Sequence, residues 1–557
     1  MFREDIIKFG SANKMKKKSN FIVQGSILAL AGILSRVIGI ARRFPMEHII
    51  GDMGNGYYSA AYELYAMMLI VSCYSLPLAV SKVVSSKIIR RQYKSAERVF
   101  QCAMIFAISS GGLLFFVCEL VGDFLASRMM LEPMSAPALK VLGPALLIVA
   151  VMGVFRGYFQ GLGNMMPTAV SQILEQIFVL AGSIVGAYFL FGYGEKVGAL
   201  LHNENYGPAY GAAGASLGPV IGAVVGLLFL VFMYYLYKIK VKPTKKPNVV
   251  EKTDSYKQIF RLILITILPV LLSTTVYNIS NIIDIRIYND VMIQKGLGDI
   301  KAYNWGVYSG KYKVMVNVPI ALANAMCSSI VPVLTGLMVR EEFGQARAKV
   351  SQAIRFTMIV AIPSSVGLAV LARPIISMLF KGEIDMAVNL LHIGSVSVIF
   401  YTLSTLSNGV LQGINKMNIP VRNAAIALVV HVVFLYTTLQ LGWGINTVVY
   451  SNILFAVIVC ILNARAISKY LKYRQEYIRT FAIPLIASII MGAVLALINL
   501  FLAKLLGNVI TVFLGIILGV VVYFVSLIKL KGIQENDLKS MPGGRTVLTI
   551  TKKFKLL

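Results

Sequence analysis

Apolar stretches, each about as long as a bilayer is thick, follow one another along almost the whole chain, from residue 21 to residue 529. A bilayer core of roughly 30 Å needs about 20 apolar residues for each helical span. The first stretch is as long as a full span and is followed by others of the same kind, so we interpret it as a retained helix and not as a signal peptide. Windows of this kind predict fourteen spans, near residues 21–44, 57–84, 99–122, 139–159, 167–191, 212–237, 259–284, 305–335, 351–372, 386–412, 419–441, 444–467, 481–504 and 508–529.

The composition agrees with a protein whose solvent is lipid, because 57% of the 557 residues are apolar and only 14% are charged. No stretch between the spans is long enough for a soluble catalytic domain, so the sequence predicts a protein that is not an enzyme. The five cysteines lie in apolar segments without CxxC spacing and the four histidines are scattered, so neither a metal nor another cofactor is expected.

The net charge of +29 comes from 53 Lys and Arg against 24 Asp and Glu. In a soluble protein such an excess would suggest nucleic acid as a partner, but in a membrane protein it gathers in cytoplasmic loops that face anionic lipids. The basic segments alternate along the chain, so we expect both termini in the cytoplasm, anionic lipids as partners and no nucleic acid. These segments lie at residues 14–18, 87–98, 238–257, 340–349, 465–479 and in the C-terminal KKFKLL.

A repeated motif divides the chain into two similar halves. RGYFQGLGNM at 156–165 recurs as NGVLQGINKM at 408–417, and each copy closes an even-numbered span, the fourth and the tenth. The sequence therefore predicts an all-α integral membrane protein of about fourteen transmembrane helices, with two six-helix lobes related by a pseudo-twofold axis along the membrane normal and a C-terminal helix pair. The expected parts are a cytoplasmic tail 1–20, an N-lobe 21–237, a linker 238–258, a C-lobe 259–467, a final helix pair with its basic loop 468–529 and a tail 530–557.

Charged side chains at membrane depth are costly unless they face water, a partner or a ligand, so each one is a candidate site residue. Arg36 lies about 24 Å along the first span at about 1.5 Å per residue, which places it in the outer half of the membrane. Arg42 follows about two turns later, while Glu63 of the second span and Lys311 of the eighth belong to the same layer. Lys311 has no structural partner that the sequence reveals.

The seventh span carries a polar face after Pro269. Thr274, Asn278, Asn281 and Asp284 follow one another four, three and three residues apart on one helical face, and Arg286 ends that face. A proline followed by such a face is typical of a broken helix that lines a transporter cavity, with a structural bend as the alternative. Glu175 and His431 lie deeper, where each could titrate, bind a cation or stay neutral in a hydrogen bond.

The run RGYFQGLGNMMPTAVSQILEQ at 156–176 resembles a signature of the polysaccharide-flippase branch of the multidrug/oligosaccharidyl-lipid/polysaccharide exporter superfamily. GILSRVIGIARRF at the first span, SLPLAVSKVVSSKI at the second and the fourteen-span plan extend this likeness, which is nearest to lipid II flippases and stage V sporulation protein B-like proteins. The resemblance implies two lobes in a V around a cavity that opens to alternate sides, a last helix pair with a groove for a polyprenyl tail, and diphosphate contacts from Arg36, Arg42 and Lys311. Arg43 stands where the family commonly has Asp, so no charge relay is expected through that position.

We therefore predict a flippase for undecaprenyl-diphosphate-linked saccharide in the bacterial cytoplasmic membrane, with the peptidoglycan precursor lipid II as the favoured substrate. The cavity holds more cations than anions, which suits phosphate, and no Walker A motif is present to use ATP. A coupling cation is a further candidate partner, without a site assigned to it. A flippase for another lipid-linked glycan and a cation-coupled multidrug exporter are the alternatives.

Overall fold

The computed structural model of the protein describes residues 14–74, 76–90, 92–241 and 254–533. The centre of the expected linker 238–258 and most of the expected tails 1–20 and 530–557 lie outside these residues.

Helices make up all the regular secondary structure of the described ranges, with no strand among them. Those before the linker are α2 (Lys14–Ala41), α3 (Arg43–Leu69), η2 (Ile70–Tyr74), α4 (Leu76–Ile89), α5 (Tyr93–Phe124), η3 (Leu125–Met129), η4 (Pro133–Ser135), α6 (Ala136–Gly161), α7 (Met166–Leu201) and α8 (Tyr206–Val241). Those after it are α9 (Tyr256–Gln294), η6 (Gly298–Ile300), α10 (Lys301–Val307), η7 (Tyr308–Tyr312), α11 (Lys313–Val339), α12 (Phe343–Val370), α13 (Ala372–Leu379), α14 (Asp385–Gly394), α15 (Ser397–Gly413), α16 (Asn418–Gln440), α17 (Asn446–Leu471), η8 (Ile478–Ala482) and α18 (Ile483–Lys529).

Ten helices of the described residues are long and apolar enough to cross a membrane. They are the helical segment Arg43–Ile89, which contains α3, η2 and α4, the helices containing α5, α6, α7, α8, α12, α16 and α17, and the two halves of α18. The pair α14 and α15, bent by 48°, can form an eleventh span. Helices α2, α9 and α11 cover most of the first, seventh and eighth predicted spans. The prediction of an all-helical, multi-pass membrane protein is confirmed.

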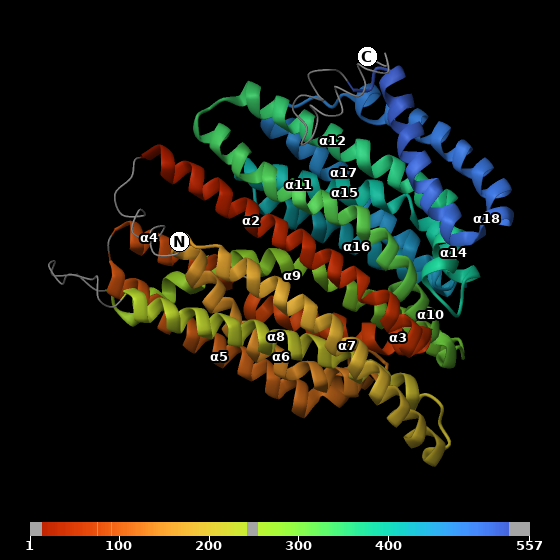
Figure 1. The fold of residues 1–557 in the computed structure, drawn as a ribbon, viewed down its shortest axis with the longest axis horizontal. Coiled ribbons are helices and arrows are strands. Elements are labelled where there is room, and N and C mark those ends of the chain that lie inside the picture. Colours follow the sequence, from red (N-terminus) through yellow and green to blue (C-terminus); the bar gives the residue numbers. More distant parts are fainter. Residues whose placement is uncertain (1–13, 75, 91, 242–253, 534–557) are drawn as a thin grey trace. The chain divides into compact units, whose positions relative to one another are not determined.

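The chain folds into two compact units, the first made of Met1–Ile50 and Tyr57–Ile282, the second of Gly51–Gly56 and Ile283–Leu557. In the first unit α5, α6, α7 and α8 run side by side (Figure 1). Buried apolar side chains of α4, α5, α6, α8 and the start of α9 form its core, in which Phe100 packs against the rings of Phe155, Tyr158 and Tyr234. Such a core lets the outer faces of these helices remain apolar for lipid.

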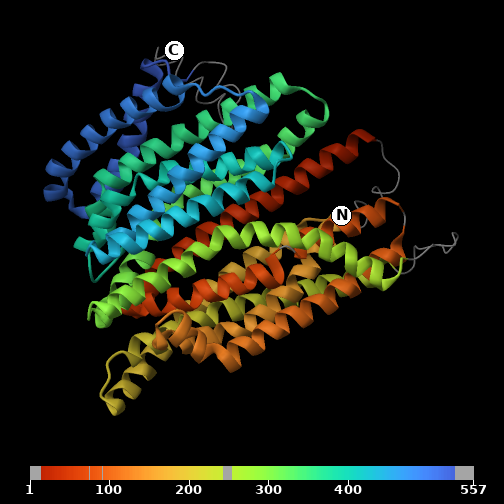
Figure 2. The ribbon, with the colours of Figure 1, turned by 180° about the vertical axis from the view of Figure 1, so that it is seen from behind.

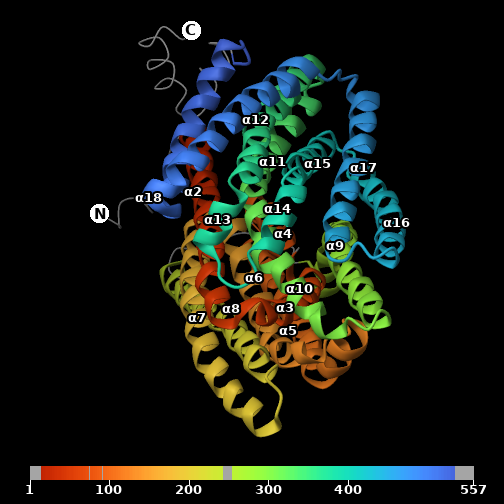
Figure 3. The ribbon, with the colours of Figure 1, turned by 90° about the vertical axis from the view of Figure 1, so that its right-hand side faces the viewer.

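In the second unit α18 turns back on itself at Gly507, whose φ of 75° is available to glycine without strain (Figure 2). The two halves of α18 lie at one edge of the unit, while α16 and α17 form the opposite edge, with α11, α12 and α15 between them (Figure 3). The last two predicted spans are therefore an antiparallel pair that packs on α12 and α13.

The glycines of the repeated motif allow a close contact between two helices in each unit. In the first unit a methyl group on Gly161 of α6 would lie 2.7 Å from Val84 Cβ of α4. In the second unit a methyl group on Gly413 of α15 would lie 2.8 Å from Leu334 Cβ of α11. Small residues let membrane helices approach closely, so the motif joins the fourth predicted span to the second and the tenth to the eighth.

Irregular backbone occurs in the second and eighth predicted spans and in the expected loop before the second, whereas the seventh predicted span lies in one continuous helix. Helix α9 continues through Pro269 from Tyr256 to Gln294, so the expected break there is wrong. Instead Gly51 interrupts α3 with a φ of 65°. The π-helical turn η2 lies between α3 and α4, and the π-helical turn η7 lies between α10 and α11. Turns of this kind are frequent at functional sites.

Candidate functional site

Lys311, a predicted cavity cation, lies completely buried in the second unit on the π-helical turn η7. Its ammonium group donates to Asp52 Oδ2 at 2.8 Å, to the carbonyl oxygen of Lys381 at 2.5 Å and to that of Glu383 at 3.0 Å. Asp52 also accepts the backbone N–H of Glu383 at 3.1 Å. Three acceptors match the three donors of an ammonium group, so the expectation that Lys311 lacks a structural partner is wrong.

Close backbone packing holds this ion pair in place. A methyl group on Gly306 of α10 would lie 1.7 Å from the carbonyl oxygen of Asp52, and one on Gly56 would lie 2.0 Å from that of Ala302. The interruption of α3 at Gly51 therefore brings residues 51–56 against α10, where only glycine fits at both contacts. Asp52 could not be recognised as a partner from the sequence, because it lies in an expected loop, outside the apolar windows.

A second polar cluster of the same unit contains Asp284 of α9 and His431 of α16. Their side chains are 3% and 0% exposed, and His431 Nε2 lies 2.5 Å from Asp284 Oδ1. The other ring nitrogen of His431 lies 2.9 Å from the carbonyl oxygen of Ser451 on α17. Asn452 donates to Asp284 Oδ2 at 3.3 Å. Asp284 therefore faces a partner within its unit, and the deep histidine of the sequence belongs to an ionisable pair.

Arg286 does not join this cluster. It is followed one helical turn later by Asp290, and the two side chains form an ion pair of 3.5 Å, each more than two-fifths exposed. An exposed pair at this spacing contributes a few tenths of a kcal/mol, about 0.3–0.5 by comparison with other helices. The polar face predicted on the seventh span thus divides at its end into a buried acid and an exposed base.

In the first unit Arg42 is 6% exposed and donates from its Nη1 to Ser183 Oγ at 3.0 Å. Ser183 in turn donates to the carbonyl oxygen of Ala215 at 2.8 Å. The Arg42 guanidinium lies 5.9 Å from the ring centre of Tyr58, and that of Arg43 lies 5.2 Å from the same ring. Among the described residues neither Arg42 Nε nor the Tyr58 hydroxyl has a hydrogen-bond partner. An arginine with an unused buried N–H, a second arginine close by and an unused phenol hydroxyl together form an arrangement that suits an anion.

The other predicted site residues of the first unit are more accessible. Arg36 and Asn278 are exposed, and Glu63 and Asn281 are half-buried. Arg36, Arg42, Glu63, Asn278 and Asn281 belong to the first unit, and Asp284, Arg286 and Lys311 to the second. Glu175, for which the sequence allowed several roles, forms an ion pair of 2.7 Å with Arg156, a residue of the repeated motif.

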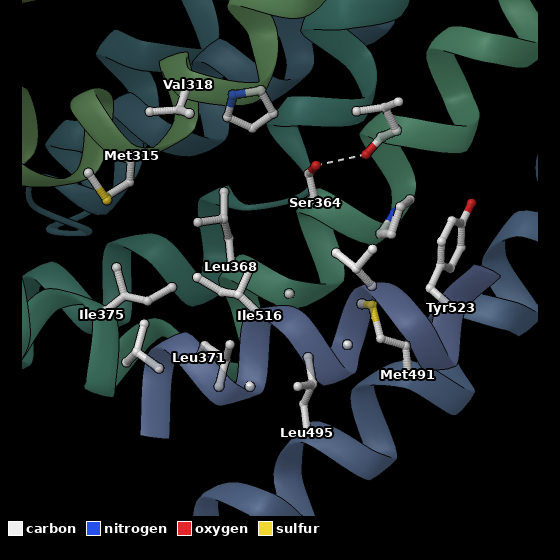
Figure 4. A pocket seen from close by; sticks show the side chains of 18 of the residues that line it. Met315, Val318, Ser364, Leu368, Leu371, Ile375, Met491, Leu495, Ile516 and Tyr523 are labelled. Atoms are coloured by element: carbon white, nitrogen blue, oxygen red, sulfur yellow. Dashed lines mark hydrogen bonds between the residues drawn. The ribbon is translucent and has the colours of Figure 1, made fainter. Parts of the chain in front are cut away.

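An apolar groove of about 510 Å³ lies in the second unit between α11, α12, α13 and both halves of α18. Leu368, Leu371, Leu495 and Ile516 are among its lining residues (Figure 4). Ser364 is one of the few polar residues there, and its hydroxyl is used in a hydrogen bond of 2.7 Å to the carbonyl oxygen of Val360. The groove therefore offers almost nothing but hydrocarbon, which suits an alkyl or prenyl chain.

Residues 22–338, more than half of the chain, match the family model described as polysaccharide biosynthesis protein. The chain belongs to this family. A second model, MatE, matches residues 315–437. The predicted membership of the multidrug/oligosaccharidyl-lipid/polysaccharide exporter superfamily is therefore confirmed.

Two curated relatives from Bacillus subtilis are similar to the chain. Stage V sporulation protein B is 24% identical over 536 residues, which cover 94% of this chain and 98% of that protein. Lipid II flippase MurJ is 24% identical over 430 residues, which cover 74% of this chain and 77% of that protein.

Solved structures share the fold. The inward closed conformation of lipid II flippase MurJ matches 90% of this chain and 97% of its own, with a TM-score of 0.59 and 16% identity. An inward-facing MATE family transporter matches 78% of this chain and 99% of its own, with a TM-score of 0.57 and 17% identity. The predicted two-lobe fold class is confirmed by these likenesses.

Proposed function

We propose that this protein is a flippase for saccharides carried on a polyprenyl diphosphate, with the peptidoglycan precursor lipid II as its favoured substrate. It works by alternating access in a bacterial cytoplasmic membrane, with both termini in the cytoplasm, basic loops facing anionic lipids and no catalytic step. The lipid II flippase and the sporulation protein among its relatives support this assignment.

The observation that carries the proposal is the groove beside α18. A flippase for a lipid-linked sugar must hold a long prenyl chain while its polar head crosses the membrane. Each buried CH₂ group contributes about 0.8 kcal/mol, so an apolar groove of about 510 Å³ can retain a substantial part of such a chain. A transporter of small cationic drugs needs no groove of this kind.

The diphosphate head requires cations, and Arg42 is the best placed. Its Nε–H is unused among the described residues, and planar guanidinium donors can hold two phosphate oxygens at once. Within each unit, further residues are proposed to contact the substrate: Arg36, Glu63, Asn278 and Asn281 in the first, and Asp284, Arg286 and Lys311 in the second. Lys311 and Asp284 would reach substrate only in a conformation that opens their present ion pairs.

Expression in a bacterium depleted of its own lipid II flippase tests the proposal. The wild-type chain should restore growth and remove precursor from the inner leaflet. Gly515→Phe should lower this activity, because the groove-lining Gly515 has Leu371 and Leu495 within 4 Å of an added Cβ, so a ring there enters the groove. Gly112→Phe is the matched control, since no atom lies within 4 Å of a Cβ added there. Lost activity in both variants, or in neither, contradicts the role of the groove.

Two alternatives predict other outcomes. A flippase for another lipid-linked glycan would leave the depleted strain inviable but would restore the surface polymer in a strain that lacks the flippase for that glycan. The match of residues 315–437 to the MatE model favours a cation-coupled drug exporter as the second alternative. If the protein is such a drug exporter, cells that express it should export drugs, and their lipid-linked precursors should be unaffected.

A further inference from the structure

The segment just before α9 is held against the ends of α4 and α5 in the first unit. Lys87 of α4 donates to the carboxylate of Asp254. Arg98 of α5 donates from Nη1 to the carbonyl oxygen of Asp254 at 2.8 Å. The hydroxyl of Tyr256, the first residue of α9, donates to Gln101 Oε1 of α5 at 2.9 Å. These five residues, which we call the α9 junction, join segments that are more than 150 positions apart in the chain.

The α9 junction contains two cations but only one carboxylate from the described part of the chain. The lysine uses that carboxylate, and its side chain is 11% exposed. The half-buried Arg98 contacts neutral groups there, namely the carbonyl oxygen of Asp254 and the ring of Tyr256, whose centre lies 5.2 Å from the guanidinium carbon. Glu97, the nearest acid along α5, lies 3.8 Å from Lys238. Because a partly buried cation is costly without a counter-charge, the described junction has room for one more negative charge.

Exposed apolar side chains flank the α9 junction on all three helices. Ile89 at the end of α4 is 79% exposed, and Tyr93 at the beginning of α5 is exposed as well. On α9 the exposed side chains are Tyr256 and Phe260, while Ile259 and Ile263 of the same helix lie in the buried core of the unit. In a membrane protein such exposed side chains face acyl chains. A basic pocket between membrane helices, beside a surface for acyl chains, is typical of a phospholipid headgroup site.

We propose that the α9 junction binds the headgroup phosphate of an anionic phospholipid. The lipid belongs to the leaflet on the linker side, which the proposed topology makes the cytoplasmic leaflet. Its single negative charge supplies the counter-charge of Arg98, whereas a phosphatidylcholine brings its own cation and supplies none. An ammonium has three donors and a guanidinium five, so Lys87 and Arg98 keep donors for the phosphate oxygens beyond their contacts with Asp254. The bound lipid fastens the beginning of α9 to α4 and α5, whether or not the protein flips a saccharide.

Photo-capture of lipids by the purified full chain tests the site. Benzoylphenylalanine replaces Tyr93, the protein is placed in nanodiscs with equal amounts of phosphatidylglycerol and phosphatidylcholine, and mass spectrometry identifies the captured lipid. One basic residue near a membrane surface favours an anionic lipid about fivefold, so phosphatidylglycerol should be captured about five times as often. The same probe at Tyr188 of α7 is the control, because Tyr188 is exposed and its described ring contact is with Phe189. Equal capture of the two lipids is expected there.

Charge variants assign the preference to the α9 junction. Arg98→Gln should remove the preference at position 93, and Arg98→Lys should keep most of it, because lysine retains the charge. Arg128→Gln is the matched control, since Arg128 is an exposed arginine in η3, beyond the other end of α5. If Arg98→Gln folds poorly, the comparison of the probes at Tyr93 and Tyr188 decides the question without it.

The outcomes are distinct. A preference at position 93 that Arg98→Gln removes and Arg128→Gln leaves intact supports the lipid site. Equal capture of both lipids at position 93 overturns it. An equal preference at position 188, or one that Arg128→Gln also removes, overturns it too, because a basic protein then attracts anionic lipid without a defined site. If inorganic phosphate added in solution removes the preference, the junction binds a free anion, and the assignment to a lipid is wrong.

Discussion

The ion pair between Lys311 and Asp52 allows a quantitative test of what the buried lysine does. Its side chains are 0% and 2% exposed, and the Lys311 ammonium group has three acceptors within 3.0 Å. Removing one partner of a buried pair costs about 3–5 kcal/mol, because the other charge is left without compensation. Lys311→Ala should therefore lower the free energy of unfolding by about that amount.

A second change separates the charge from the hydrogen bonds. In Lys311→Met with Asp52→Asn no buried charge remains, but the carbonyl groups of Lys381 and Glu383 still lose their donor. Unsatisfied buried groups of this kind cost about 1–3 kcal/mol. The double variant should thus be more stable than Lys311→Ala, although it carries one substitution more.

Unfolding of the purified variants by heat and by denaturant is the assay, with Lys381→Ala as the control because only the backbone carbonyl of Lys381 accepts from Lys311. If Lys311→Ala unfolds at the wild-type midpoint, or if the double variant is less stable than Lys311→Ala, the ion pair does not stabilise the fold. The complementation assay then separates the two roles of the lysine. A stable double variant without flipping activity would indicate that Lys311 also serves the substrate, whereas an active one would restrict it to structure.

Two further predictions concern topology and the head-group site. Cysteines placed at Glu204 and Arg340, both exposed, should react with an impermeant reagent from opposite sides of the membrane, and labelling of both in intact cells would refute the alternating arrangement of the loops. Arg36→Ala should stop flipping and should stay inactive when combined with Glu63→Gln, because a diphosphate contact cannot be restored by neutralising an acid. Rescue by Glu63→Gln in the same complementation assay would instead assign Arg36 to an ion pair with Glu63.

The helical, membrane-spanning class of the fold followed from local properties of the chain. A span needs a minimum length of apolar residues, and that requirement can be counted from sequence alone. The repeated motif was equally informative, because glycines at fixed spacing imply close helix contacts wherever they occur. Gly161 and Gly413 make such contacts with equivalent spans of their own units.

Partners of charged residues could not be found in this way. The sequence placed Lys311 and His431 at membrane depth, but Asp52 is 259 positions from the first and Asp284 is 147 positions from the second. Only tertiary packing brings such residues together. The break predicted at Pro269 was wrong because a proline can bend a long helix without breaking it. The π-helical turns lie instead at η2 and η7.

The sequence by itself thus determined that this protein is a helical membrane protein of two similar halves, because hydropathy and repeats are properties of successive residues. Tertiary structure alone decided which charges are neutralised inside the protein and which remain available to a ligand. The reason is energetic: a buried ion costs several kcal/mol without a partner, and whether a partner exists depends on the folding of distant segments. Lys311 and Arg42 looked alike in sequence, yet one has three acceptors and the other keeps an unused donor.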